Sequence, residues 1–129
     1  MRYVRLYTGA DGETQFEEIE VALTPQDFAP PARPFDLSAP VDAQRVIFGT
    51  SPAGWSGARH VAPRRQFAFQ FTGELEVEGG GGRRHVFGPG SIALVEDTTG
   101  AGHATRVIGD APVTVAFVQL PERLSYPAT

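Results

Sequence analysis

The 129-residue chain lacks cysteine altogether. This absence excludes disulfides, thiolate nucleophiles and cysteine-ligated zinc sites. A metal site in this chain would have to use histidine, carboxylate, amide, hydroxyl or water ligands.

Lysine is also missing, so every basic side chain other than histidine is an arginine. Without lysine, Schiff-base catalysis through a lysine amine is excluded. The formal net charge at pH 7 is −4, and the sequence shows no basic cluster of the kind that contacts nucleic acid. We therefore expect no nucleic-acid partner.

Long apolar runs are absent as well. The first residues, MRYVRLYTGADGE, do not resemble a signal peptide, and no stretch is long and apolar enough to span a membrane. The sequence therefore predicts a soluble, cytoplasmic protein without a membrane partner. Its length predicts a single domain.

What the sequence does contain is apolar alternation with a period of two, which is typical of strands. The proline-rich stretch 24–40 is predicted to be an extended connector that lies over a surface, and 51–58 is predicted to be a loop. Four consecutive glycines, 79–82, predict a flexible hairpin tip. We expect no helix of normal length. Strands are predicted at residues 2–8, 14–23, 43–50, 65–72, 74–78, 83–87, 91–96, 103–109 and 113–120. Many short strands separated by turn residues predict an all-β sandwich or barrel.

Two segments of the sequence resemble the signature motifs of the cupin family. In the first, Gly54 is followed after five residues by His60, then by Gln66 and Gly73, in the pattern G-x5-H-x-H-x3,4-E-x6-G. In the second, Gly90 opens a strand and the Gly100-Ala-Gly step leads into His103. The sequence pattern of these segments is similar to that of small single-domain bacterial cupins.

The resemblance implies a cupin-type double-stranded β-helix, that is, a jelly-roll barrel with N-terminal strands flanking it. Residues 1–129 would form one domain. Its parts would be N-terminal strands and a proline-rich connector (1–42), a barrel core with both motifs (43–120) and a tail (121–129).

Cupins typically hold a divalent metal with three histidines and a glutamate, and the resemblance implies His60, Gln66 and His103 as ligands of Fe, Mn, Ni or Zn. The pattern is incomplete, because Ala62 stands where the second histidine is expected and Gln66 stands where the glutamate is expected. Losing an imidazole and a carboxylate should weaken metal binding by several kcal/mol, on the order of a sizeable part of structural zinc affinity. Glu96 or Asp97 would be the acids available to repair the site, unless Asp97 only caps the turn through its own backbone.

The resemblance also implies a small organic ligand inside the barrel. His103 would bind metal or act as an acid–base group, with Glu96 as the second proton-transfer group. Trp55 and Gln70 would line the pocket, and Arg64 would hold a substrate carboxylate. The predicted activity is that of a metal-assisted isomerase, dehydratase or dioxygenase. The alternative is a metal-free binding or sensor module.

Strand alternation adds a prediction about assembly. Gln66, Ala68 and Gln70 share one face of their strand, and three phenylalanines (67, 69 and 71) share the other. If the glutamines face the barrel, the phenylalanines form an exposed apolar patch that a partner would cover, which predicts a homodimer. The alternative places the phenylalanines in the core and Gln66 in solvent.

Overall fold

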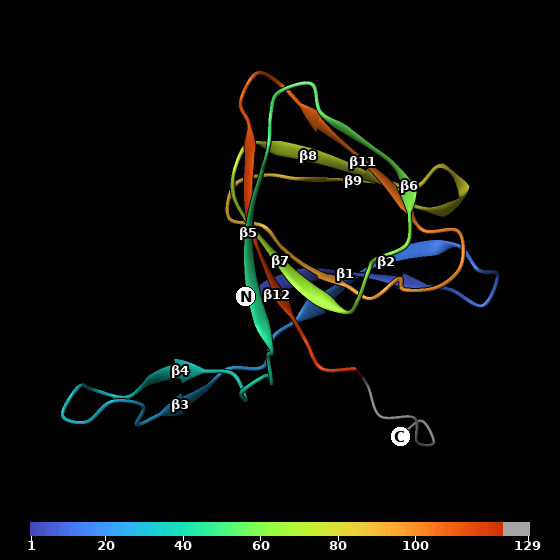
Figure 1. Cartoon of the computed structure of the whole chain (residues 1–129). Helices are drawn as coiled ribbons and strands as arrows, with labels where there is room; N and C mark the ends of the chain where they lie inside the picture. The colour runs from blue at the N-terminus through green and yellow to red at the C-terminus, as the bar shows by residue number, and fades with distance from the viewer. Residues whose placement is uncertain (123–129) are drawn as a thin grey trace.

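The structure, a computed structural model, describes residues 1–122, and it is built from strands (Figure 1). Residues 123–129, which make up most of the predicted tail, lie outside the described residues. The only helical element in residues 1–122 is a short 3-10 turn at Gly80–Gly82, which lies at the predicted hairpin tip. The all-β prediction is confirmed for this part of the chain.

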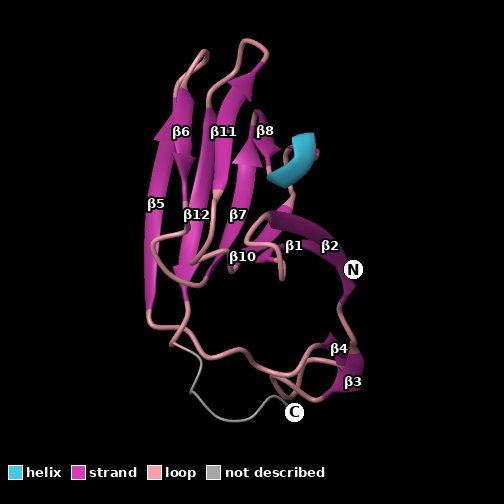
Figure 2. Cartoon of the chain, turned by 90° about the vertical axis from the view of Figure 1, so that its right-hand side faces the viewer, coloured by secondary structure: helices cyan, strands magenta, loops and turns pink. Residues whose placement is uncertain are grey.

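Two sheets face each other across the interior (Figures 1 and 2). The larger sheet contains, in spatial order, β2 (Thr14–Glu20), β1 (Arg2–Thr8), β10 (Ile92–Val95), β7 (Gln66–Thr72), β12 (Val113–Gln119) and β5 (Arg45–Ser51). The smaller sheet contains β6 (Ser56–His60), β11 (His103–Ile108), β8 (Glu74–Glu78) and β9 (Arg84–Phe87). The strands of residues 1–122 form these separate sheets and not one closed barrel.

One parallel pairing joins the N-terminal hairpin to the rest of the large sheet. β1 runs alongside β10, with Leu6 opposite Val95, whereas the other pairings in the two large sheets are antiparallel. Three of the four residues of β10 are buried, because both faces of this strand are covered. The pairing brings the N-terminal hairpin beside the bend that follows Val95.

Two connecting segments differ from the sequence prediction. The proline-rich stretch forms a small hairpin, β3 (Thr24–Gln26) and β4 (Phe35–Leu37), and does not lie over a surface. The hairpin projects away from both sheets (Figures 1 and 2). Phe28 and Phe35 stack on each other with ring centroids 5.8 Å apart. In the other segment, the predicted loop is shorter than expected, because β6 already begins at Ser56.

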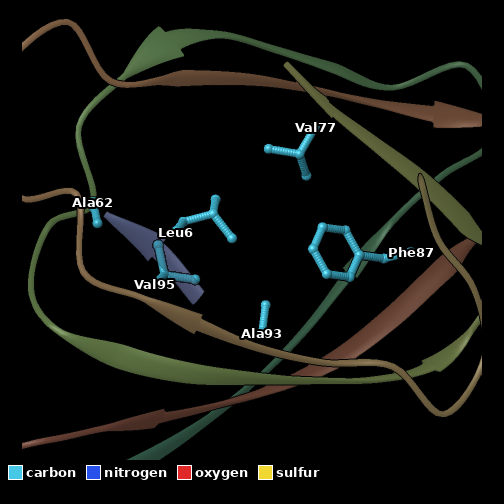
Figure 3. Close-up of a cluster of buried hydrophobic side chains, with 6 residues drawn as sticks. All are labelled: Leu6, Ala62, Val77, Phe87, Ala93 and Val95. Atoms are coloured by element: carbon cyan, nitrogen blue, oxygen red, sulfur yellow. The ribbon is translucent and has the colours of Figure 1, made fainter. Parts of the chain in front are cut away.

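The hydrophobic core lies between the two sheets. Six buried side chains form it: Leu6, Ala62, Val77, Phe87, Ala93 and Val95 (Figure 3). All six also line an internal cavity, so the core surrounds an open space.

Candidate functional site

The cavity between the sheets has a volume of about 460 Å³. This size is within the usual range for pockets that take small organic molecules. Among the residues predicted to form a site, Trp55, His60, Gln66, Gln70 and His103 line the cavity. The remaining lining is mostly apolar, and none of the lining residues in the described part of the chain is Arg, Asp or Glu.

A pair of histidines lies in the wall of the cavity. His60 ends β6 and His103 begins β11, and the two residues are direct partners in the antiparallel ladder. Their ring centroids lie 4.8 Å apart, at an angle of 56° between the planes. The two sequence motifs, which lie far apart in the chain, therefore meet at this point of the cavity, as the resemblance implied.

The carboxylate of Asp97 holds His103 in place. Asp97 is fully buried, and its Oδ2 lies 2.5 Å from Nδ1 of His103 and accepts a hydrogen bond from Oγ1 of Thr14 at 2.8 Å. Thr14 is also fully buried and comes from β2 of the N-terminal hairpin. A carboxylate that accepts the Nδ1 proton fixes the tautomer of the ring and supports a positive charge on it.

The structure separates Glu96 from this site, which corrects the predicted catalytic role of Glu96. Val95 lines the cavity, so the alternation of the strand turns Glu96 to the other side and Asp97 back toward His103. Glu96 forms ion pairs with Arg65 and with Nε of Arg5, the latter at 2.7 Å.

These contacts also set the charge state of Arg5. Burial disfavours the charged form of Arg5, but hydrogen bonds and attraction to Glu96 and Glu17 outweigh it. The net effect raises the pKa of the Arg5 guanidinium above its ordinary value. Glu96 thus joins two arginines in a structural cluster.

Arg64 is likewise not part of the cavity wall, contrary to the prediction. Its guanidinium donates to the side chain of Gln44 and to the carbonyl oxygen of Leu120, 3.1 Å from the latter. These contacts connect the start of β7 to the chain before β5 and after β12. Arg64 is therefore not placed to hold a substrate carboxylate in the cavity.

The glutamines of β7 lie on the predicted face. Gln66 and Gln70 are buried and line the cavity together with Ala68, so the alternative with Gln66 in solvent is wrong. Nε2 of Gln119 donates to Oε1 of Gln66 at 3.1 Å, and Nε2 of Gln70 donates to the carbonyl oxygen of Phe87 at 2.7 Å. Both amides therefore stabilise the wall as well as face the cavity.

Glycines allow the bend between Asp97 and His103 to pack tightly. Gly102 has φ +77°, and a Cβ at this position would lie 2.2 Å from the carbonyl oxygen of His60. Gly100, with φ +79°, approaches Gly12 in the N-terminal hairpin almost as closely. The two glycines thus allow the bend to contact both His60 and the N-terminal hairpin.

The potential metal ligands near the histidine pair do not make up the full metal site that the family resemblance implies. His60 and His103 offer two imidazoles, Ala62 offers no donor, and Gln66 offers a neutral amide oxygen. Within residues 1–122, no three histidine or carboxylate side chains gather in a way that could hold a metal ion. The carboxylate of Asp97 is hydrogen-bonded to Nδ1 of His103. It therefore orients the imidazole and does not serve as a further metal ligand next to it.

In comparisons with known proteins, no family model and no curated protein matches the sequence. In the described part of the chain, no helix has the length and apolar character needed to cross a membrane.

Sequence reasoning did not identify Thr14 and left open whether Glu96 or Asp97 takes part in the site. A signal for Asp97 was present, because the inward position of Val95 places the residue after next on the same side. Thr14 gave no such signal, since its contact with Asp97 joins positions 83 apart in the sequence.

Proposed function

We propose that this chain is a cupin-like protein that binds a small, largely apolar organic molecule in the cavity between its sheets. We further propose that His103 transfers a proton to or from that molecule. The observation that supports this most is the buried hydrogen bond between Asp97 and His103 at the wall of an apolar cavity of about 460 Å³.

The chemistry follows from the arrangement of the ring. Nδ1 of His103 is hydrogen-bonded to Asp97, which leaves Nε2 as the ring nitrogen that can contact a ligand. When Nε2 takes a proton from a bound molecule, the ring becomes positively charged, and the carboxylate stabilises that charge. The mostly apolar lining lowers the polarity around the ring and strengthens this interaction.

A substitution that fills the cavity tests the binding function. We expect Ala93→Leu, in the core at the cavity wall, to weaken binding of the neutral fluorescent probe N-phenyl-1-naphthylamine at least tenfold. The same change should raise the free energy of unfolding by about 1 kcal/mol, because it fills empty space. Probe fluorescence and urea unfolding provide the two measurements.

The matched control is Ala104→Leu, at a residue that does not line this cavity. It should leave probe binding unchanged. Wild-type protein that does not bind the probe, or equal binding by wild type and Ala93→Leu, would contradict the proposed cavity function.

A non-catalytic binding module is the second candidate, and the incomplete donor set at Ala62 and Gln66 favours it. Exchange of ligand protons for solvent deuterium, followed by NMR with 1-indanone as the ligand, separates the two functions. Exchange that disappears in His103→Gln supports proton transfer, whereas binding without exchange supports the module. Elemental analysis of protein purified without a metal-affinity tag tests the divalent metal that the family resemblance implies.

We also propose a homodimer, and the outer face of the large sheet supports it. Phe69 and Phe48 both pair with Ala116 across β12, so they share one row on the face opposite the cavity. Phe48 is 78% exposed and Phe71 55% exposed. A stable dimer buries about 1,600 Å² in total, and an apolar face of this kind is suited to such a contact.

The dimer predicts that Phe48→Glu yields a monomer in light scattering at micromolar concentration, because a buried charge opposes association. Val86→Glu provides the control, since Val86 is an exposed apolar residue on the smaller sheet. The control should remain dimeric. A wild-type monomer, or a Phe48→Glu dimer of unchanged affinity, would be evidence against this interface.

A further inference from the structure

The two cavity histidines have the same protonation pattern, and their hydrogen bonds reveal it. Nδ1 of His60 lies 2.7 Å from the carbonyl oxygen of Ala58, and a carbonyl oxygen can only accept. Nδ1 of His103 lies 2.5 Å from the Asp97 carboxylate, which also accepts from Thr14. Both rings therefore carry their proton on Nδ1, and in the neutral form each presents Nε2 as an acceptor.

The two acceptors thus belong to rings that lie next to each other in the cavity wall, His103 buried and His60 exposed. They cannot bond to each other, and in the described part of the chain neither Nε2 has a hydrogen-bond partner. His103 is only 6% exposed, so its unused acceptor sits in a mostly apolar surrounding. Nε2 of His103 is not among the fully enclosed polar atoms without a partner, so it is accessible from the cavity. A ligand that donates a hydrogen bond to it gains that bond in a mostly apolar surrounding.

The rest of the lining limits which donor fits. The lining residues include no arginine or carboxylate, so a cationic head group finds no opposite charge, and an anionic one finds none while both imidazoles are neutral. The apolar residues Leu6, Val77 and Phe87 surround the remaining space (Figure 3). A neutral hydroxyl on a compact apolar body satisfies both conditions.

We propose that the cavity selects neutral hydroxyl compounds, phenols above all, whose O–H donates to the acceptor pair formed by Nε2 of His60 and Nε2 of His103. This inference rests on the proposed function, because it requires that the cavity bind a small molecule. It adds the chemical class of the ligand and assigns His60 as a residue that determines specificity. A hydroxyl bound in this way also directs its proton toward Nε2 of His103, the atom that would accept it in the proposed proton transfer.

Calorimetric titration with three probes of one shape tests the proposal. The probes are 4-ethylphenol, its methyl ether 4-ethylanisole and the anion 4-ethylbenzoate. We expect the phenol to bind about five- to tenfold more tightly than the ether, which corresponds to one hydrogen bond, and the benzoate to bind most weakly.

Two histidine variants locate the effect. His60→Phe keeps an aromatic ring in the wall but removes its Nε2, and it leaves the Asp97–His103 contact in place. It should reduce the preference for the phenol over the ether to about twofold or less, because one acceptor of the pair is gone. His85→Phe is the control, because His85 packs between Phe16 and Phe87 and does not line the cavity. The control should retain the full preference, and circular dichroism should show that both variants are folded.

The outcomes separate this inference from the function on which it rests. If phenol and ether bind equally well, or if benzoate binds most tightly, the hydroxyl recognition is wrong while the cavity function stands. A preference that is unchanged in His60→Phe also overturns the proposal. If none of the three probes binds and N-phenyl-1-naphthylamine does not bind either, the proposed function itself fails.

Discussion

Gly102→Ala is expected to lower the free energy of unfolding by about 3 kcal/mol or more. A residue with a side chain at φ +77° costs about 1–2 kcal/mol, and overpacking adds about 1–3 kcal/mol. The added Cβ would lie 2.2 Å from the carbonyl oxygen of His60, and this neighbour is backbone that cannot simply rotate away. Urea unfolding followed by far-UV circular dichroism measures the change.

Gly109→Ala is the matched control for that variant. Gly109 has φ +78°, and no atom lies within 4 Å of the position that its Cβ would take, so the control carries only the conformational cost of about 1–2 kcal/mol. Gly102→Ala should exceed the control by about 2 kcal/mol and should also weaken probe binding, because the strain falls on His60. Equal losses in the two variants would show that the contact with His60 relaxes freely.

Asp97→Ala is expected to lower the free energy of unfolding by about 3 kcal/mol. The substitution leaves two buried donors, Oγ1 of Thr14 and Nδ1 of His103, without their acceptor, at about 1–3 kcal/mol each. Thermal and urea unfolding provide the measurement.

A double-mutant cycle with Thr14→Val isolates the contact between the N-terminal hairpin and the carboxylate. In the wild-type background, Thr14→Val should cost about 1–2 kcal/mol. In the Asp97→Ala background it should be neutral or stabilising, because it removes a buried donor whose acceptor is already gone. Costs that add within about 0.5 kcal/mol would show that the Thr14–Asp97 bond contributes little to stability.

The sequence was informative wherever alternation was regular. The pattern of residues 66–72 correctly predicted the strand and the inward face of Gln66, Ala68 and Gln70. The resemblance to the cupin motifs implied that His60 and His103 belong to one site, and the structure places them as direct partners on neighbouring strands of one sheet. In the first case a short-range rule was sufficient, because side chains along a strand alternate between its faces.

Where several rules compete, the sequence was less informative. Glu96 and Asp97 are adjacent acids at a bend, and only the extension of the strand alternation across Val95 distinguishes the arginine-paired acid from the one that holds His103. The hairpin of β3 and β4 forms within a proline-rich stretch that favours extended backbone but does not forbid pairing at an isolated edge. Whether the two sheets close into a barrel depends on long-range packing that local patterns do not encode.

The parallel pairing of β1 with β10 has a consequence for how the molecule folds. β1 and β2 are synthesised long before β10. Leu6 can therefore pair with Val95, and Thr14 can bond to Asp97, only after most of the chain has been made. Closing so long a loop carries an entropic cost that local hairpins such as β8–β9 do not have, so we expect the N-terminal hairpin to dock late. A nascent chain would then hold both histidines on neighbouring strands while His103 still lacks its full support. The Asp97–Thr14 contact behind His103 would then form only in the last folding step.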